Sequence, residues 1–396
     1  MRDDVTLLAG VEAPLSTPWP PFDPQAVDFL ADLSAELLRD PAARRQEAAA
    51  AFGFWCRRAH LEALARRHAV PLPRLGRGLV FHLAPSNVPV LFAYTMAIGL
   101  LAGNANVVRL SSRRTEAETA LLAPLRRVLA RPEHAAVRAR TALIAYDRND
   151  AITAAYCAAC DARVVWGGDA TVAALRAMPM PPHAVELSFP DRWSLAVLSQ
   201  AAFTVLTDGE RADLAHRFYN DTYQMDQNAC SSPRLVLWLA DGGSPDCRRL
   251  WWETVAAEVE ARYPFGPFQA ARKLERLYQC AITMTDPPVA SVQRYRGNRL
   301  YVAGLERLPA QPEQLQGGFG LFFESTIAGL EQLPPLLSPR VQTLVCGGLA
   351  CGEVARFLAE RRVRGVDRVV PLGQALEIDT IWDGKDLIAA LSRMIH

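Results

Sequence analysis

The residue best suited to covalent chemistry is Cys230, which lies in a stretch of small and polar residues, QNACSSP at 227–233. An apolar stretch, Leu235–Leu239, follows directly and is typical of a buried strand. A loop held by a rigid strand is a common place for a side chain that substrate must reach. Backbone N–H groups in such a loop lower the pKa of a thiol and stabilise an oxyanion beside it. The pattern leaves two interpretations open, a catalytic thiolate or a buried thiol.

The other seven cysteines are scattered along the chain, which favours free thiols in a reducing compartment. Cys157 and Cys160 have CxxC spacing, but no second CxxC and no histidine pair accompanies them. They lie at an alanine-rich helical stretch, 151–159, so we interpret them as core residues and not as redox or metal sites. The histidines show no HxxxH or HxH spacing, and we expect no metal.

The elements around these residues follow from the periodicity of apolar residues. After a proline-rich, extended lead-in at 1–25, helices are expected at 26–38 and 42–68. Strands and helices then alternate, with the strands expected at 79–83, 107–110, 143–146 and 164–166. This alternation predicts an α/β fold with a doubly wound parallel sheet.

Ligands of doubly wound sheets bind at the carboxyl ends of the strands. Functional residues are therefore expected in the loops 84–87, 110–113 and 167–169. Strands at 195–198 and 235–239 predict a second α/β unit, and the segment 367–396 is expected to end in an amphipathic helix.

Composition places the chain among ordinary globular proteins. It has 396 residues, half of them apolar and 21% charged, with a net charge of +1. The length favours two domains, and the charge balance excludes a nucleic-acid-coating or membrane-surface protein. The longest apolar run, 88–102, is shorter than the roughly 20 residues of a membrane span. With no secretory signal visible at the N-terminus, we expect a cytoplasmic protein.

Five groups of residues, in this order, resemble the LuxC-type acyl-CoA reductases. They are APSNVP at 84–89, VVRLSS at 107–112, VWGGD at 165–169, NACSSP at 228–233, and the closing pair DRVVP at 367–371 with WDG at 382–384. These enzymes include the fatty-acid reductase of the bacterial luciferase system and belong to the aldehyde dehydrogenase superfamily. The resemblance covers about residues 75–396. It implies an aldehyde dehydrogenase-like fold, with a Rossmann-type cofactor domain and an α/β catalytic domain.

The resemblance also implies a reaction. An acyl thioester would acylate Cys230, and hydride from NADPH would convert the acyl-enzyme to a thiohemiacetal that collapses to an aldehyde. A thiolate suits both halves, because it is a good nucleophile and a good leaving group. The implied partners are acyl-CoA or an acyl-protein donor, with an acyl-activating enzyme or a carrier protein as its source, and the superfamily suggests a homo-oligomer.

Two further catalytic residues are implied by position. Asn87 matches the asparagine of the superfamily's Pro-x-Asn-x-Pro motif, whose amide helps to bind the oxyanion; it would also cap the following helix. Glu186 matches the acid of a Glu-Leu-Gly-Gly motif, but Ser188 and Phe189 replace the glycines. A structural or proton-managing role of Glu186 is therefore as well supported as water activation.

The cofactor is expected to be NADPH. NAD-selective sheet enzymes usually place an acid at the end of the second strand, and here no acid occurs between Arg109 and Glu116. In many NAD-using aldehyde dehydrogenases a lysine matches Arg109 and a glutamate matches Ser112. Guanidinium groups bind a 2′-phosphate in bidentate fashion. The residues expected to contact the cofactor are Pro85, Ser86, Arg109, Ser111, Ser112, Arg113, Gly167 and Gly168.

We therefore expect a cofactor domain at 1–188 with 365–396, and a catalytic domain at 189–364. Two alternatives remain at this point. One is NAD(P)-dependent aldehyde oxidation, which an intact Glu-Leu-Gly-Gly segment would favour. The other is a non-catalytic, acyl-carrying partner subunit, which loss of Cys230 or of the 84–89 motif would favour.

Overall fold

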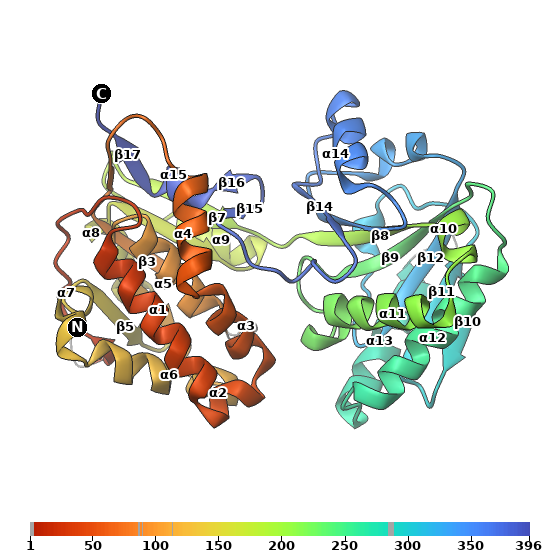
Figure 1. Ribbon diagram of the computed structural model, residues 1–396, viewed down its shortest axis with the longest axis horizontal. Coiled ribbons are helices and arrows are strands. Elements are labelled where there is room, and N and C mark those ends of the chain that lie inside the picture. The colour runs from red at the N-terminus through yellow and green to blue at the C-terminus, as the bar shows by residue number, and fades with distance from the viewer. Residues whose placement is uncertain (1–3, 86–87, 89, 113, 284–288) are drawn as a thin grey trace. The chain divides into compact units, whose positions relative to one another are not determined.

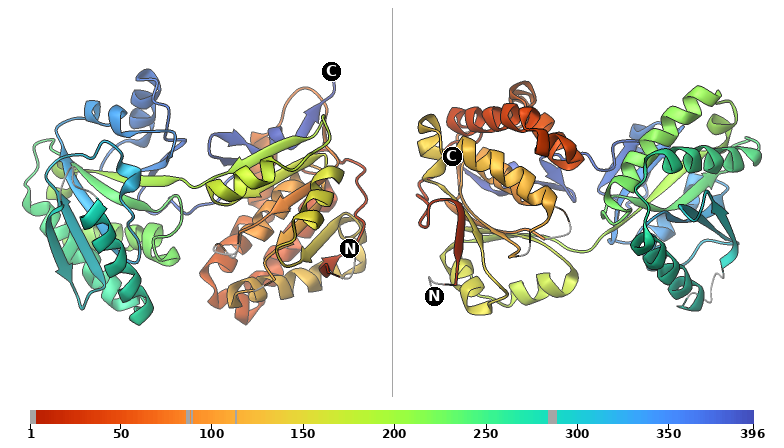
Figure 2. Two further views of the ribbon diagram at one scale, coloured as in Figure 1. Left: turned by 180° about the vertical axis from the view of Figure 1, so that it is seen from behind. Right: turned by 90° about the horizontal axis from the view of Figure 1, so that it is seen from below.

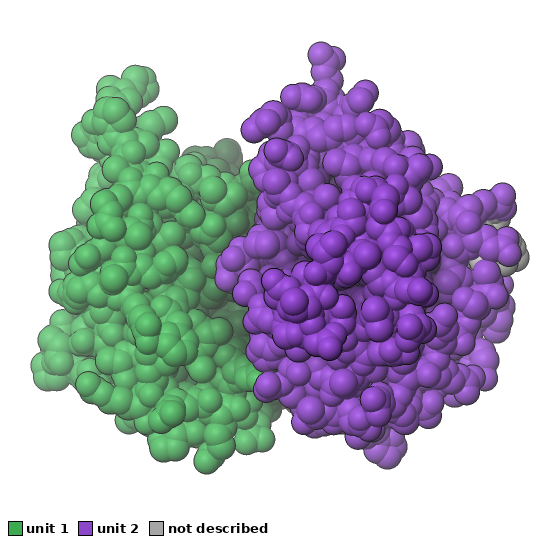
Figure 3. All heavy atoms as spheres, turned by 45° about the vertical axis from the view of Figure 1, so that its right-hand side comes forward, with its two compact units in different colours: residues 1–190, 378–396 green, residues 191–377 purple. Residues whose placement is uncertain are grey.

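The structure is a computed structural model that describes residues 4–85, 88, 90–112, 114–283 and 289–396 (Figure 1). The chain divides into two compact units (Figure 3). Unit 1 consists of residues 1–190 and 378–396, and unit 2 of residues 191–377. Each unit is built around its own, mainly parallel sheet.

The sheet of unit 1 has the strand order β1-β5-β4-β3-β6-β7 in the described residues. Its strands are β1 (Thr6–Gly10), β3 (Leu79–Leu83), β4 (Ala105–Leu110), β5 (Thr141–Ala145), β6 (Ala162–Trp166) and β7 (Val185–Phe189). All neighbours are parallel except β1, which pairs antiparallel with β5. Strands β3 and β6 lie side by side although β4 and β5 separate them in the chain. The order therefore reverses between β3 and β6, which is the topological switch point of a doubly wound sheet.

Helices cover both faces of this sheet (Figure 2). The crossover helices are α5 (Leu91–Leu101), α6 (Glu116–Leu129), α7 (Ala135–Arg138), α8 (Asp150–Ala159) and α9 (Asp169–Arg176). Helix α5 is buried along its whole length and shares one core with Val80 and Val164 of the sheet. Phe81 and Val165 point to the opposite core, with residues of α8 and α9. Consecutive residues of one strand therefore point to different cores, so both faces of the sheet are covered.

A second helical layer extends the α5 side of the sheet. It consists of α1 (Pro24–Arg39), α2 (Pro41–Arg45), α3 (Glu47–Trp55) and α4 (Arg58–Arg67), whose apolar residues belong to the same core as α5. Two small ribbons complete unit 1, formed by β2 (Arg74–Gly76) with β17 (Ser392–Met394) and by β15 (Ile381–Trp382) with β16 (Lys385–Asp386).

Unit 2 has the strand order β10-β11-β12-β9-β8-β13-β14 in the described residues. The strands are β8 (Trp193–Ser199), β9 (Pro233–Leu239), β10 (Val289–Tyr295), β11 (Leu300–Leu305), β12 (Leu321–Ile327), β13 (Val341–Gly347) and β14 (Arg368–Pro371). Only β10, at one edge, runs antiparallel to its neighbour.

The helices of unit 2 also form two layers. They are α10 (Gln200–Thr204), α11 (Asp208–Thr222), α12 (Asp246–Arg262), α13 (Pro267–Thr283) and α14 (Cys351–Glu360). Trp251 and Trp252 of α12 are buried with Trp238 of β9 on one face. Leu277 of α13 is buried with Leu235 on the other face. Cys230 lies three residues before the start of β9, which is a central strand of this sheet.

The structure departs from the expected elements most clearly near the two ends of the chain. The lead-in contains β1, which hydrogen-bonds to the edge of the sheet. The helix expected at 42–68 is three helices, because Gln46 and Arg57 adopt extended backbone angles. The expected C-terminal amphipathic helix is a single turn, α15 (Leu387–Ala390), followed by β17.

None of the helices in the described part of the chain is both long enough and apolar enough to cross a bilayer.

Candidate active site

The backbone before Cys230 takes an uncommon course. Asp226 and Gln227 have left-handed φ angles of 51° and 57°, which are rare for residues with a side chain. Hydrogen bonds hold this turn on both sides, from the N–H of Gln227 to the carbonyl of Thr222 at 2.7 Å and from the N–H of Phe319 to the carbonyl of Asp226 at 2.8 Å. Strained turns held by their surroundings are concentrated at functional sites.

Buried side chains fasten the loop to the strands around it. The amide of Gln227, which is fully buried, donates to the carbonyl of Pro233 at 3.1 Å and accepts from the N–H of Gly320 at 3.2 Å. The hydroxyl of Ser194, on β8, donates to the carbonyl of Cys230 at 2.6 Å. These contacts hold Cys230, which is itself half-buried, on a rigid base.

A guanidinium ties the loop to a second segment. Arg276 of α13 donates to Oδ1 of Asn228 at 3.0 Å and to the carbonyl of Gly317 at 2.6 Å. Its guanidinium also lies 4.9 Å from the centre of the Phe319 ring. Sequence reasoning did not identify Arg276, because nothing near it in the chain relates it to Cys230.

The other cysteines differ from Cys230 in burial or location. Cys157 and Cys160 are completely buried, as predicted, and burial raises the pKa of Cys160 to about 12 with a further contribution from Cys157. Cys351 is also half-buried, but it is the first residue of a helix. Every other cysteine apart from Cys230 is buried. Cys230 is thus the half-buried thiol that lies in a polar loop before a strand.

In unit 1, two of the three loops chosen from the sequence follow the strands of the switch point. Pro85 follows β3 and is half-buried, and Gly167 and Gly168 follow β6. Gly168 is the N-cap of α9, and a Cβ added at Gly167 would lie 3.2 Å from the Thr171 side chain. Backbone N–H groups at such a helix start can bind phosphate. Ser86, Asn87 and Arg113 fall outside the described residues.

One buried hydroxyl links the elements that flank these two loops. Oγ1 of Thr95, on α5, lies 2.7 Å from Nδ1 of His82 and accepts from the indole N–H of Trp166 at 3.2 Å. His82 is near the end of β3 and Trp166 ends β6. Nε2 of His82 lies 2.8 Å from Oδ1 of Asn106. Sequence reasoning missed this network, since only the fold brings β3, β6 and α5 together.

Arg109 lies within β4, and Ser111 and Ser112 follow that strand. The guanidinium of Arg109 lies 4.7 Å from the centre of the Tyr146 ring and donates to the Tyr146 carbonyl at 3.3 Å. Its Nε has no hydrogen-bond partner among the described residues. Ser111 is half-buried and Ser112 is exposed. An orphaned, buried donor of this kind fits an anionic ligand.

Glu186 lies on β7, where two guanidinium groups hold its carboxylate. Oε1 accepts from Nε of Arg176 at 2.9 Å, and Oε2 accepts from Arg163. Burial alone would raise the pKa of Glu186, but the hydrogen bonds from Arg176 and Arg163 outweigh burial and lower it. Its carboxylate is therefore ionised and already engaged within unit 1.

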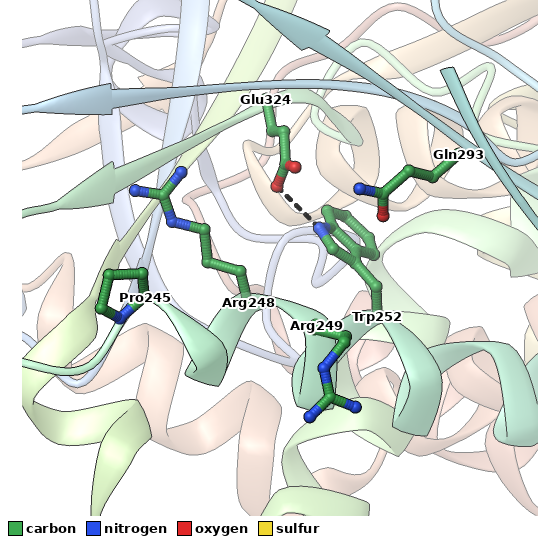
Figure 4. Close-up of a pocket in the computed structure, with 6 residues that line it drawn as sticks. All are labelled: Pro245, Arg248, Arg249, Trp252, Gln293 and Glu324. Atoms are coloured by element: carbon green, nitrogen blue, oxygen red, sulfur yellow. Dashed lines mark hydrogen bonds between the residues drawn. The ribbon is translucent and has the colours of Figure 1, made fainter. Parts of the chain in front are cut away.

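Figure 4 shows a hollow of about 280 Å³ in unit 2. It is lined by Pro245, Arg248, Arg249, Trp252, Gln293 and Glu324. One carboxylate oxygen of Glu324 accepts from the indole N–H groups of Trp238 and Trp252, at 2.9 and 2.8 Å. No residue of the Cys230 loop lines this hollow.

One group of side chains in the described residues has donor atoms close enough to hold a metal ion, Asp32, Glu133 and His134, with the atoms within 4.8 Å of one another. The Asp32 carboxylate already contacts Nε2 of His134 at 3.0 Å, and a guanidinium nitrogen of Arg131 lies 3.8 Å away. This nearby positive charge disfavours a cation.

Comparison with protein families identifies the family of this chain. The family described as acyl-CoA reductase (LuxC) matches residues 57–269, which is more than half of the chain and includes the Cys230 loop. The chain belongs to the LuxC acyl-CoA reductase family. The resemblance seen in the sequence is thereby confirmed. A search of curated proteins finds no match.

Solved structures show the fold of this LuxC family member. A putative aldehyde dehydrogenase from Burkholderia cenocepacia is 16% identical, with a TM-score of 0.59 over 94% of this chain and 84% of that one. A mutant of the 1-pyrroline-5-carboxylate dehydrogenase from Thermus thermophilus is 13% identical, with a TM-score of 0.62 over 95% and 81%. An NADP-dependent glyceraldehyde-3-phosphate dehydrogenase from Bacillus halodurans, complexed with NADP, is also 13% identical, with a TM-score of 0.62 over 93% and 85%. The α/β, aldehyde dehydrogenase-like fold is confirmed, and membership of an acyl-CoA reductase family makes the chain an oxidoreductase.

Proposed function

We propose that this chain reduces an acyl thioester to an aldehyde with NADPH, through an acyl intermediate on Cys230. The observation that carries the proposal is the Cys230 loop. In this member of an acyl-CoA reductase family, a half-buried thiol follows a strained turn. Hydrogen bonds from Gln227 and Ser194 hold the loop in place. A nucleophile needs this combination of access and rigidity.

In the first half of the proposed reaction, Cys230 is the nucleophile. The thiolate of Cys230 attacks the acyl carbon, the negative charge passes to the carbonyl oxygen, and the donor thiolate then leaves with the electrons of its C–S bond. The amide of Asn87 and the N–H of Cys230 are the proposed donors to the oxyanion. This half needs no cofactor.

The second half converts the acyl-enzyme to product. NADPH, when bound, supplies the hydride that the acyl carbon accepts. Protonation of the oxygen yields a thiohemiacetal. When its hydroxyl returns that proton to solvent, the carbonyl re-forms, the C–S bond breaks, and the aldehyde and the Cys230 thiolate are released. The role of the protein is to protect the acyl-enzyme from water. The engagement of Glu186 by Arg163 and Arg176 supports this, because the carboxylate is committed to an ion pair and is not an available base.

The proposed cofactor residues lie in unit 1. Gly167 and Gly168, with Pro85 and Ser86, would hold the pyrophosphate at the switch point, where such sheets bind their ligands. Arg109, with Ser111, Ser112 and Arg113, would bind the 2′-phosphate. The orphaned Nε of Arg109 supports this assignment. We accordingly assign cofactor binding to unit 1 and covalent catalysis to unit 2.

The remaining assignments follow from the chemistry. The acyl donor is acyl-CoA or an acyl-protein, delivered by an acyl-activating enzyme or a carrier protein. A thiolate nucleophile and NADPH both belong in a reducing compartment, so we place the chain in the cytoplasm. A homo-oligomer is proposed from the superfamily.

The experiment is aldehyde formation from a panel of acyl-CoAs and acyl-carrier proteins with NADPH. Cys230→Ala should abolish aldehyde release and, without NADPH, the acyl adduct seen by mass spectrometry. Cys351→Ala is the matched control, because Cys351 is the other half-buried thiol. The two single variants Cys157→Ala and Cys160→Ala are controls for the CxxC pair. All three controls should retain turnover. An adduct on another cysteine would overturn the assignment of the nucleophile.

A further inference from the structure

A second arginine lies beside the Cys230 loop, and its surroundings differ from those of Arg276. Arg234 is the second residue of β9, four residues after Cys230. Its Nε is buried and has no hydrogen-bond partner among the described residues. The stem is packed against Gly317, where an added Cβ would lie 3.0 Å from Cβ of Arg234 and 3.2 Å from its Cγ. The side chain is thus held in place without using its Nε donor.

The charges around Arg234 include one group of like sign and two of opposite sign. Burial lowers the pKa of Arg234, while the negative charges of the Cys230 thiolate and the Asp191 carboxylate raise it. Burial also lowers the pKa of Arg276, and the charge of Arg234 lowers it further. Two guanidinium groups therefore repel each other beside the nucleophile.

The two arginines differ in what offsets that repulsion. Arg276 gains hydrogen bonds to Asn228 and Gly317, and the opposite charge of Glu275 on its own helix favours its charged form, although Arg272 opposes it. Asp191 is exposed, so water screens its attraction to Arg234. The half-buried thiol of Cys230 is the better match for a guanidinium whose Nε is buried, since a charge formed there is less screened.

We propose that Arg234 stabilises the thiolate of Cys230, both before it attacks the acyl donor and when it leaves the thiohemiacetal. The inference rests on the proposed function, in which Cys230 is the nucleophile. The thiol loses its proton to solvent, and the guanidinium compensates the negative charge that remains on Sγ. When the S–C bond to the acyl carbon forms, this charge moves to the oxyanion; when that bond breaks, the charge returns to Sγ beside Arg234. Arg234 acts through the thiolate, so it is an electrostatic positioning residue and does not react itself.

The experiment measures the rate of iodoacetamide alkylation of Cys230 against pH, read from the Cys230 peptide by mass spectrometry. In the wild-type protein the midpoint should lie below about 8.5, the value of a free cysteine. Arg234→Met should raise it by about one pH unit, which is about tenfold slower alkylation at pH 7. Arg234→Lys, which keeps the charge, should have a midpoint close to that of the wild type. A merely structural arginine would change folding or turnover without moving this midpoint.

Two variants serve as controls for charge. Asp191→Asn should leave the midpoint unchanged or lower it, because it removes a carboxylate that competes for Arg234. Arg272→Met removes an exposed arginine of α13 that is paired with Glu275 and should leave the profile as in the wild type. If Arg234→Met and the wild type share one midpoint, or Asp191→Asn reproduces the upward shift, the proposal is wrong.

The measurement remains decisive if Arg234→Met does not fold, since a wild-type midpoint at or above 8.5 alone refutes the proposal. It also separates this inference from the proposed function. Alkylation needs neither acyl donor nor NADPH, so aldehyde release by Cys230→Ala would refute the nucleophile and leave the pH profile as measured.

Discussion

Replacing Thr95 by valine tests whether the buried network between the two loops of unit 1 holds them in place. The Thr95 side chain is buried, and valine has nearly the same shape without the hydroxyl. The substitution removes the partner of Nδ1 of His82 at 2.7 Å and of the Trp166 indole at 3.2 Å. No cavity is created, so the effect isolates hydrogen bonding.

The protonation of His82 determines which atom donates. Burial lowers the pKa of His82 to about 4, although the hydrogen bond with Asn106 acts in the opposite sense, so the ring is neutral at pH 7. Since Oδ1 of Asn106 can only accept, Nε2 carries the proton and Nδ1 accepts from the Thr95 hydroxyl. In the valine variant both Nδ1 and the Trp166 N–H lose their partners.

The expected cost follows from those two losses. Each buried polar group left without a partner costs about 1–3 kcal/mol, so Thr95→Val should lower the free energy of unfolding by about 2–6 kcal/mol. A typical domain is stable by only about 5–15 kcal/mol, so the change is large. Turnover should fall as well, because Thr95 links α5 to β3 and β6, which precede the two proposed cofactor loops.

The assay is urea unfolding at pH 7 followed by circular dichroism, with Thr119→Val as the matched control. Thr119 is exposed on α6, and its hydroxyl donates only to the carbonyl of Thr115 at 3.0 Å. Its loss should cost less than about 0.5 kcal/mol, as for most surface substitutions. In the acyl-transfer assay without NADPH, Thr95→Val should still acylate Cys230, since that step belongs to unit 2. Equal stability losses in the two variants would refute the reasoning.

Two other predictions concern unit 1. Glu186→Gln should lower the free energy of unfolding at pH 7 by about 1–3 kcal/mol, because two guanidinium groups lose a charged acceptor. The folded pKa of Glu186 lies below its unfolded value of about 4.3, so the wild-type advantage is complete above that pH and is lost as the pH falls through the folded pKa. Denaturant titrations at pH 7 and at successively lower pH values below about 4.3 check this, and an advantage that does not decline as the pH falls would contradict it. NADPH should bind more tightly than NADH by fluorescence titration, and the double variant Arg109→Ala, Arg113→Ala should lose that preference. Equal affinities in the wild type would exclude a 2′-phosphate site.

Several strands of both sheets could be predicted because parallel strands buried on two faces are continuous apolar runs. The expected strands 79–83, 107–110 and 235–239 coincide with or lie within β3, β4 and β9. Strand β1 was missed because its residues do not form such a continuous apolar run and because they precede a proline-rich stretch. Its pairing with β5 comes from a long-range hydrogen-bond partner that local composition does not encode.

In the candidate site, too, local features could be predicted from the sequence and long-range contacts could not. Cys230 could be singled out because its polar loop and the strand after it are neighbours in the chain. Its supporting contacts could not, because Ser194, Gly320 and Arg276 come from distant segments. Arg234 shows the limit most clearly. Its position four residues after Cys230 is visible in the sequence, but an arginine near the start of a strand is usually a solvated residue. What makes it a candidate for stabilising the thiolate is a buried Nε without a partner among the described residues, next to a second guanidinium, and only the folded chain brings these together.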